Sequence, residues 1–203
     1  MKKQKWILRL AVLAAVLSAL FAHYALEPWG FYWRVSQEEA ALRLSYVAAA
    51  EQHLGINEAD GSFRVILERY NRQQPIPEGY VLTESDSWCA AFVTVCAMDA
   101  ALGEQVPPEC SCQRQIALWQ TLGRWEEDDG AIPLPGDLIY YDWNESQLRD
   151  CTGWADHVGI VVGVKWPLIH VIEGNRDDQV RYRTIFINDI HIRGFGKPDF
   201  SQK

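Results

Sequence analysis

Residues 85–96 read SDSWCAAFVTVC, the start of an apolar run that extends from Trp88 to Leu102 and stops at Gly103. An apolar run of this length that ends at glycine predicts a buried helix. Three polar residues directly before the run can cap this helix: Ser85, Asp86 and Ser87. The helix carries Cys89 in its first turn and Cys96 two turns later. With 3.6 residues per turn, both thiols lie on nearly the same face.

Further helices are predicted around this one, and strands are predicted after it. Residues 36–55 open with a capping box, Ser36 and Glu39, and end at glycine, whereas residues 62–71 and 113–123 are shorter helical segments. β-branched and aromatic runs follow at residues 138–143, 157–164, 167–172, 180–187 and 190–196. Helices followed by strands predict an α+β domain with a mostly antiparallel sheet.

The N-terminus has the pattern of a membrane signal. Four of the first ten residues are basic: Lys2, Lys3, Lys5 and Arg9. Residues 10–22 then lack any charge, and aromatic residues cluster at 29–33, as at a membrane interface. We therefore predict a signal-anchor at 1–34 and a folded domain at 35–203 outside the cytoplasm. A cleaved signal peptide, which would give a secreted protein, is the alternative.

The net charge of the chain bears on whether nucleic acid is a partner. The chain of 203 residues has a formal net charge of −8, although its first ten residues are basic. The remainder is therefore strongly acidic, and an acidic body gains nothing from phosphate backbones. This argues against nucleic acid as the main partner.

Cys89 is the better candidate nucleophile of the two cysteines in the apolar helix. A thiol reacts as its thiolate, and the N–H groups and dipole at a helix start favour that negative charge. Cys89 occupies such a position, whereas Cys96 lies in the apolar middle FVTVCAM and is expected to be a buried small hydrophobe.

A histidine at a strand start supplies the base that this thiol would need. His157 begins one strand, and the next strand ends with Glu173 and Asn175. If the two strands are hairpin neighbours, the start of one lies beside the end of the other. Since side chains alternate along a strand, Glu173 and Asn175 share a face and can orient the imidazole.

Four motifs in this order resemble the CHAP family of cysteine- and histidine-dependent amidohydrolases/peptidases. They are SWCAAFVTVC, PLPGDLIYYDW, DHVGIVVGV and VIEGN, and the resemblance extends from about Ala40 to Pro198. It implies a papain-like cysteine hydrolase fold related to the NlpC-type group, with helices packed on about six strands. It also implies Cys89 as nucleophile, His157 as general base, and Glu173 with Asn175 as orienting groups.

The resemblance implies peptidoglycan, or another peptide or amide, as the substrate. The bond would be N-acetylmuramoyl-L-alanine or a peptide bond of the cross-bridge. A non-catalytic wall-binding scaffold and an acyl transferase using the same residues are alternatives. No cofactor is expected. Some members bind calcium near the cleft, but residues 142–157 lack an alternation of acidic ligands, so no metal is assigned.

Three further cysteines, Cys110, Cys112 and Cys151, lie outside the predicted helix of Cys89. In an oxidising compartment, Cys110 and Cys112 could bridge each other or reach Cys151, and Cys96 is expected to stay reduced.

Overall fold

The elements follow the expected order, with helices before strands, in a computed structural model that describes residues 34–144 and 153–201. The helices are α2 (Gln37–Glu51), α3 (Arg64–Asn71), α4 (Cys89–Asp99) and α5 (Cys112–Thr121), with a short 3₁₀ helix η1 (Pro77–Gly79). The strands are β1 (Trp125–Glu126), β2 (Leu138–Tyr141), β3 (His157–Lys165), β4 (Leu168–Arg176), β5 (Gln179–Phe186) and β6 (Ile192–Gly196). The α+β class is confirmed.

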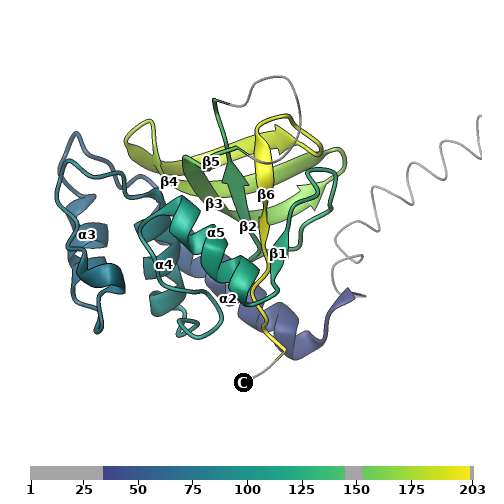
Figure 1. Ribbon diagram of the computed structural model, residues 1–203, viewed down its shortest axis with the longest axis horizontal. Coiled ribbons are helices and arrows are strands. Elements are labelled where there is room, and N and C mark those ends of the chain that lie inside the picture. The colour runs from purple at the N-terminus through teal and green to yellow at the C-terminus, as the bar shows by residue number, and fades with distance from the viewer. Residues whose placement is uncertain (1–33, 145–152, 202–203) are drawn as a thin grey trace, which may run out of the picture.

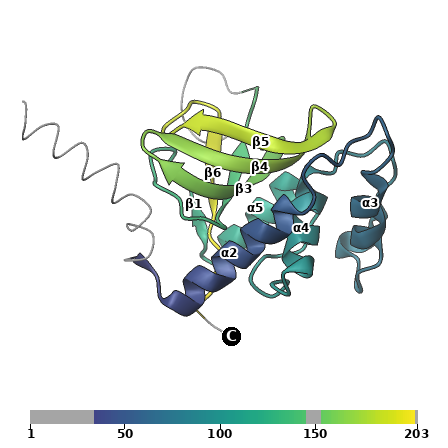
Figure 2. The same cartoon turned by 180° about the vertical axis from the view of Figure 1, so that it is seen from behind.

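The six strands form one sheet in the order β1-β6-β2-β3-β4-β5, and every neighbouring pair is antiparallel. The five predicted strand runs are all present. The sixth strand, β1, is a two-residue edge strand that the sequence pattern did not reveal. The helices gather on one side of the sheet, with α3 farthest out (Figures 1 and 2).

Helix α4 is the central element of the core. Every residue from Cys89 to Ala97 is buried. The helix contacts α2, α3 and α5 as well as β3 and β4. A helix that is apolar all round must be covered on every side, which explains why α4 is surrounded by other elements.

The start of α4 differs from the prediction. We expected Ser85, Asp86 or Ser87 to cap it, but the N-cap is Trp88 and no side chain caps the helix. Asp86 instead accepts hydrogen bonds from the backbone and hydroxyl of Thr83. The fully buried Trp88 donates its indole N–H to Glu58 over 2.9 Å. Packing of Trp88 therefore takes the place of a capping side chain.

The long first helix keeps its predicted cap and is tied to the sheet by a buried ion pair. The Ser36 hydroxyl accepts from the Glu39 N–H, as the capping box predicts. The helix ends at Glu51, slightly before the expected Gly55. Arg43, which is 5% exposed, donates to Asp137 just before β2 over 2.8 Å. This contact fixes α2 against the sheet.

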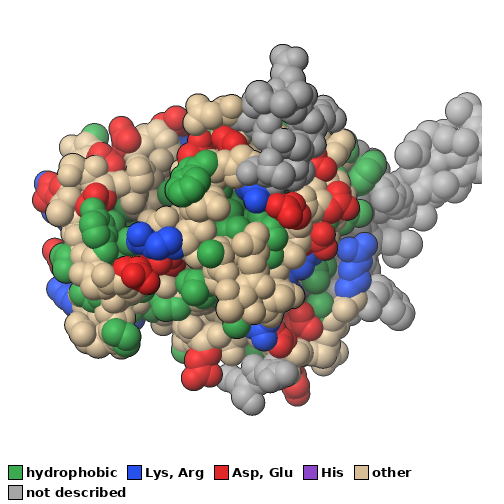
Figure 3. Space-filling model, viewed as in Figure 1, with side chains coloured by type: hydrophobic (Ala, Val, Ile, Leu, Met, Phe, Trp, Pro, Cys, Tyr) green, Lys and Arg blue, Asp and Glu red, His purple; other side chains and the backbone are tan. Residues whose placement is uncertain are grey.

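The other face of the sheet has its own apolar cluster, formed by Ile139, Tyr141, Val161, Ile169, Val171, Ile185, Ile192 and Phe195. On the surface shown in Figure 3, the described Lys and Arg side chains are scattered among acidic ones. Within residues 34–144 and 153–201, no helix is long and apolar enough to span a bilayer. The predicted signal-anchor falls almost wholly on residues 1–33, outside the described part of the chain.

Helix α4 approaches β4 closely at Gly174. A Cβ atom at this position would lie 2.4 Å from Cβ of Phe92. Glycine is therefore required for the helix and the strand to pack at this distance.

We expect Gly174→Ala to lower the free energy of unfolding by about 1–3 kcal/mol because it overpacks this contact. Gly163→Ala is the matched control, since a Cβ there meets no atom within 4 Å, and it should change stability by less than about 0.5 kcal/mol. Urea unfolding of both variants checks this. Equal effects would show that the α4–β4 contact tolerates the added methyl group.

Candidate active site

Cys89 is the first residue of α4 and is only 3% exposed. The N–H groups of the first helical turn have no partner within the helix. The backbone N–H of Ala90, in this turn, contributes to lowering the pKa of the Cys89 thiol. The missing side-chain cap of α4 thus leaves a backbone donor for the thiolate.

His157 is the first residue of β3, as predicted, and lies between Cys89 and Glu173. Its interaction with Cys89 lowers the pKa of the thiol and raises that of the imidazole. Its Nε2 lies 3.2 Å from Oε2 of Glu173. Since Nε2 faces the carboxylate, Nδ1 is the ring nitrogen left for the sulfur.

Glu173 is completely buried and uses both of its carboxylate oxygens. While Oε2 faces His157, Oε1 accepts from Nε of Arg183 over 2.6 Å. Glycine at position 159 leaves room for the Glu173 side chain, because a Cβ at that position would lie 2.7 Å from Cγ of Glu173. Sequence reasoning identified Glu173 but not Arg183 or Gly159.

Asn175 was predicted to help Glu173 orient the imidazole of His157. In the structure, Glu173 makes the contact with this imidazole. Among the described residues, no hydrogen bond joins Asn175 to His157, whose Nε2 faces Glu173. Asn175 has a φ of 56° and lies where the register between β4 and β5 shifts. A short amide residue tolerates this left-handed conformation, which accounts for asparagine at the bulge.

Cys112 is a further site residue that sequence reasoning missed. Its sulfur lies 3.6 Å from that of Cys89, and its side chain is 7% exposed. Cys112 is the first residue of α5, where Ser111 caps the helix. This position resembles that of Cys89 on α4. The cap at Ser111 was therefore the one signal in the sequence that could have indicated it.

The described cysteines are all free thiols, so neither Cys110 nor Cys112 takes part in a disulfide in this structure. The alternative that pairs them with each other is therefore wrong here, and Cys151 lies outside the described residues. Cys96 is fully buried, as expected, and burial raises the pKa of its thiol well above the usual value.

The charges of the site form an ion pair between thiolate and imidazolium. The hydrogen bond with Cys112, aided by His157, outweighs burial and holds the pKa of Cys89 well below its usual value. The same contact raises the pKa of Cys112, which therefore remains a thiol and donates its S–H. Burial opposes the imidazolium, but hydrogen bonds with Cys89 and Glu173 prevail and raise the pKa of His157 to about 10.

Glu173 completes the series of charges. Burial alone would raise the pKa of this carboxyl, but His157 and Arg183 outweigh it and lower the pKa. The imidazolium thus lies between two anions, and the far anion is held by a guanidinium. A buried charge is tolerated when it is paired in this way.

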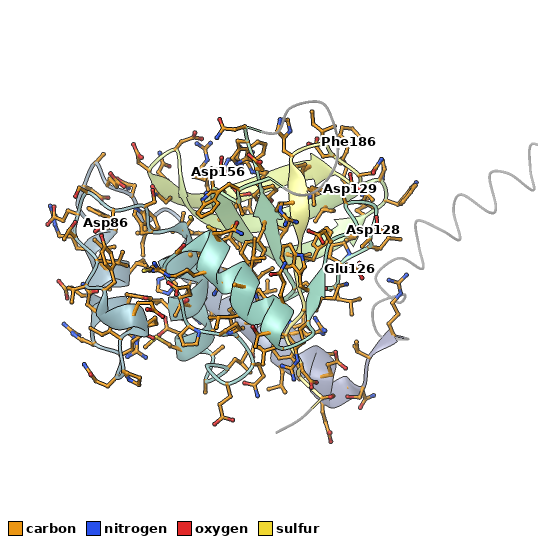
Figure 4. The ribbon with its side chains drawn as sticks, viewed as in Figure 1. Asp86, Glu126, Asp128, Asp129, Asp156 and Phe186 are labelled. Atoms are coloured by element: carbon orange, nitrogen blue, oxygen red, sulfur yellow. The ribbon has the colours of Figure 1, made fainter. Side chains whose placement is uncertain are left out.

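Aromatic rings cover one side of the imidazole. Tyr141 stacks on His157 with ring centroids 5.9 Å apart, and Trp143 stacks on Tyr141 at 5.0 Å. The Arg183 guanidinium lies 4.4 Å from the centre of the Trp143 ring. The backbone N–H of Trp143 also donates to Asp156, which is labelled in Figure 4 and directly precedes His157.

A pocket of about 210 Å³ opens beside the starts of α4 and α5. Its lining comprises Tyr80, Leu82, Asp86, Ser87, Cys110, Ser111 and Arg114. Asp86 lies on the α3 side of the molecule in Figure 4, far from the acidic residues Glu126, Asp128 and Asp129. Since Ser87 and Ser111 lie within two residues of the paired thiols, this pocket adjoins the site.

The two remaining described histidines of the strand region have partners outside the site. His170 contacts the Thr184 hydroxyl, and His191 contacts Asp189. His53 follows α2 and contacts Asp99. Within residues 34–144 and 153–201, no group of three or more His, Cys, Asp or Glu side chains is arranged to hold a metal ion.

The ion pair predicts how the reactivity of Cys89 depends on pH. Its alkylation by iodoacetamide should vary little between about pH 6 and 8, because the thiolate is already present, whereas an ordinary thiol gains about tenfold per pH unit below its pKa. His157→Ala should slow the reaction at pH 6 by about tenfold or more. Peptide mass spectrometry measures the rate at each cysteine, with buried Cys96 as the unreactive reference.

The upper limit of the ion pair lies near pH 10. Because the pKa of His157 is raised from 6.5 in the unfolded chain to about 10, its stabilising charge is fully present below pH 6.5 and is lost as pH rises through 10. A steep rise of Cys89 alkylation between pH 6 and 8, unchanged by His157→Ala, would contradict the ion pair.

Residues 81–175 match the family model of the CHAP domain. The matched segment contains Cys89, Cys112, His157 and Glu173, and thus the interacting series described above. No curated protein was found to match the chain. The match confirms, over residues 81–175, the CHAP resemblance of the sequence motifs.

Proposed function

We propose that this protein is a cysteine amidohydrolase or peptidase of the CHAP type that hydrolyses an amide or peptide bond in peptidoglycan. The observation that carries the proposal is the buried series Cys89, His157 and Glu173, in which His157 contacts the Glu173 carboxylate and helps to lower the pKa of the Cys89 thiol. The CHAP domain supports the class of substrate, since that family suggests amidases and peptidases of peptidoglycan.

The first half of the proposed reaction forms a thioester. The Cys89 thiolate attacks the carbonyl carbon of the substrate, and the carbonyl oxygen becomes an oxyanion. The backbone N–H of Cys89 has no partner within α4 because this residue opens the helix, so it is a suitable donor to that oxyanion. The imidazolium of His157 then gives its proton to the departing amine.

The second half of the reaction releases the acid. His157, now neutral, takes a proton from water, and the resulting hydroxide attacks the thioester carbonyl. Collapse of this intermediate expels the Cys89 thiolate and restores the ion pair. Glu173 holds the ring orientation and the charge of His157 throughout, and it remains a carboxylate because Arg183 holds its other oxygen.

Within peptidoglycan, the proposed bond is either N-acetylmuramoyl-L-alanine or a peptide bond of the cross-bridge. An acyl transferase would share every step up to the thioester and differ only in using an amine in place of water. A non-catalytic scaffold is less well supported, because a wall-binding domain has no need for a buried thiolate paired with an imidazolium.

We expect Cys89→Ala and His157→Ala to lower peptidoglycan hydrolysis by about 10³-fold and 10²-fold or more, because they remove the nucleophile and the proton carrier. His170→Ala is the matched control, since this residue contacts Thr184 outside the site. Mass spectrometry of the released muropeptides measures the rate and identifies the bond. An added amine acceptor separates transfer from hydrolysis. Full activity of Cys89→Ala would disprove the assignment.

We further propose that residues 1–34 hold the domain to the outer side of a membrane. The basic start, the uncharged run at 10–22 and the aromatic cluster at 29–33 support this location, which is where peptidoglycan is found. Cleavage as a signal peptide, with secretion of the mature domain, is the alternative.

Cell fractionation tests the location. The full chain should sediment with membranes, and a chain lacking residues 1–34 should not, because the apolar segment supplies the attachment. Mass spectrometry of the intact protein distinguishes an anchor from a cleaved signal. An uncleaved chain in the soluble fraction would contradict both forms of the proposal.

A further inference from the structure

Two thiols meet where two helices begin. Cys89 opens α4 and Cys112 opens α5, and their sulfur atoms are 3.6 Å apart without being bonded. A disulfide has an S–S distance of about 2.05 Å, so the sulfur atoms need to approach by only about 1.5 Å. We propose that Cys112 is a resolving thiol, which forms a reversible disulfide with Cys89 under oxidising conditions and thereby switches the site off.

The geometry selects Cys112 among the described cysteines. Cys96 is on the same helix as Cys89 but is fully buried in the apolar core. Cys110 is nearer in sequence to Cys112, yet its sulfur lies 3.7 Å from the Arg114 guanidinium and interacts with Tyr70. Cys112 is thus the one described thiol in contact with the sulfur of Cys89.

The reactivity of the two thiols is suited to sequential roles. Cys89 is held as a thiolate, the form that attacks an oxidant, whereas Cys112 is held protonated beside it. The thiolate reacts first and the thiol second, which is the order that a nucleophilic and a resolving cysteine require. The pocket beside Ser87 and Ser111 gives a small oxidant space close to the pair.

The reaction balances with a hydroperoxide as the oxidant. The Cys89 thiolate attacks one oxygen of hydrogen peroxide and forms an S–O bond to it, so that Cys89 becomes a sulfenic acid. The O–O bond breaks, and the other oxygen leaves as hydroxide and takes a proton to become water. The sulfur of Cys112 then attacks the sulfur of Cys89 and loses its proton, and the sulfenic oxygen leaves as a second water. In total, two thiols and one peroxide give one disulfide and two waters. A dithiol reverses the change and is itself oxidised to a disulfide.

The consequence is both inactivation and protection. The disulfide removes the thiolate on which the proposed hydrolysis rests, so activity stops until a reductant acts. Without a neighbouring thiol, further peroxide would convert the sulfenic acid to a sulfinic acid, which dithiols do not reduce. The contact with Cys112 therefore makes oxidation of Cys89 recoverable.

The test treats the full-length protein with hydrogen peroxide, blocks the remaining thiols and digests without reduction. Trypsin leaves Cys89, Cys96, Cys110 and Cys112 in one peptide because there is no Lys or Arg between Arg72 and Arg114. Cleavage after glutamate places Cys89 and Cys96 in residues 85–104, and Cys110 and Cys112 in residues 110–126. We expect a cross-linked pair of these peptides, with fragment ions that assign the bond to Cys89 and Cys112.

Matched variants separate the neighbouring thiols. Cys112→Ser should abolish the cross-link, leave Cys89 as sulfinic acid, and reduce the activity recovered with a dithiol by about tenfold or more relative to the parent. Cys110→Ser, two residues away, should form the cross-link and recover like the parent. Each variant is compared with its own unoxidised activity, so an effect of Cys112 on the basal rate does not affect the result.

Two results would overturn the inference: a parent protein in which peroxide converts Cys89 to sulfinic acid without any cross-link, or a cross-link that survives Cys112→Ser and disappears with Cys110→Ser. The predicted loss of activity on oxidation rests on the proposed function of Cys89 as nucleophile. The predicted disulfide between Cys89 and Cys112 does not. If the cross-link forms in a protein that does not digest peptidoglycan, the proposed function fails and the resolving role of Cys112 stands.

Discussion

Close packing of α4 against β3 and β4 is the constraint on which the site depends. The helix carries Cys89, while the two strands carry His157 and Glu173, so the distance between helix and sheet sets the distance between nucleophile and base. Gly174 permits this distance by leaving room for Phe92. A chain that buries α4 on all sides therefore positions the chemistry through the same contacts that form its core.

Electrostatics then determines how the site behaves once packing has assembled it. Thiolate, imidazolium, carboxylate and guanidinium alternate in sign from Cys89 to Arg183, so every buried charge has an opposite neighbour. Burial alone would favour the uncharged form of each ionisable group, and the neighbouring opposite charges oppose this effect. The thiol of Cys112 donates to one end of it, and this position links the reactivity of Cys89 to its proposed protection.

Much of the fold and part of the site could be predicted because they depend on local patterns. The apolar run after Trp88 and the β-branched runs after residue 137 identified α4 and five strands. The order of Cys89, His157 and Glu173 along these elements identified the central series. The capping residue of α4 could not be predicted, because three polar candidates preceded it and the choice depended on where Trp88 found space to pack.

The sequence by itself determined which elements form, which cysteine begins a helix and which histidine begins a strand, since these follow from the spacing of neighbouring residues. Only the tertiary structure decided the partners. The registers of β3–β4 and β4–β5 brought Glu173 to His157 over Gly159 and brought Arg183 to Glu173. The packing of α5 beside α4 brought Cys112 to Cys89, residues 23 positions apart. Contacts between distant residues depend on how elements are stacked, and no local pattern carries that information.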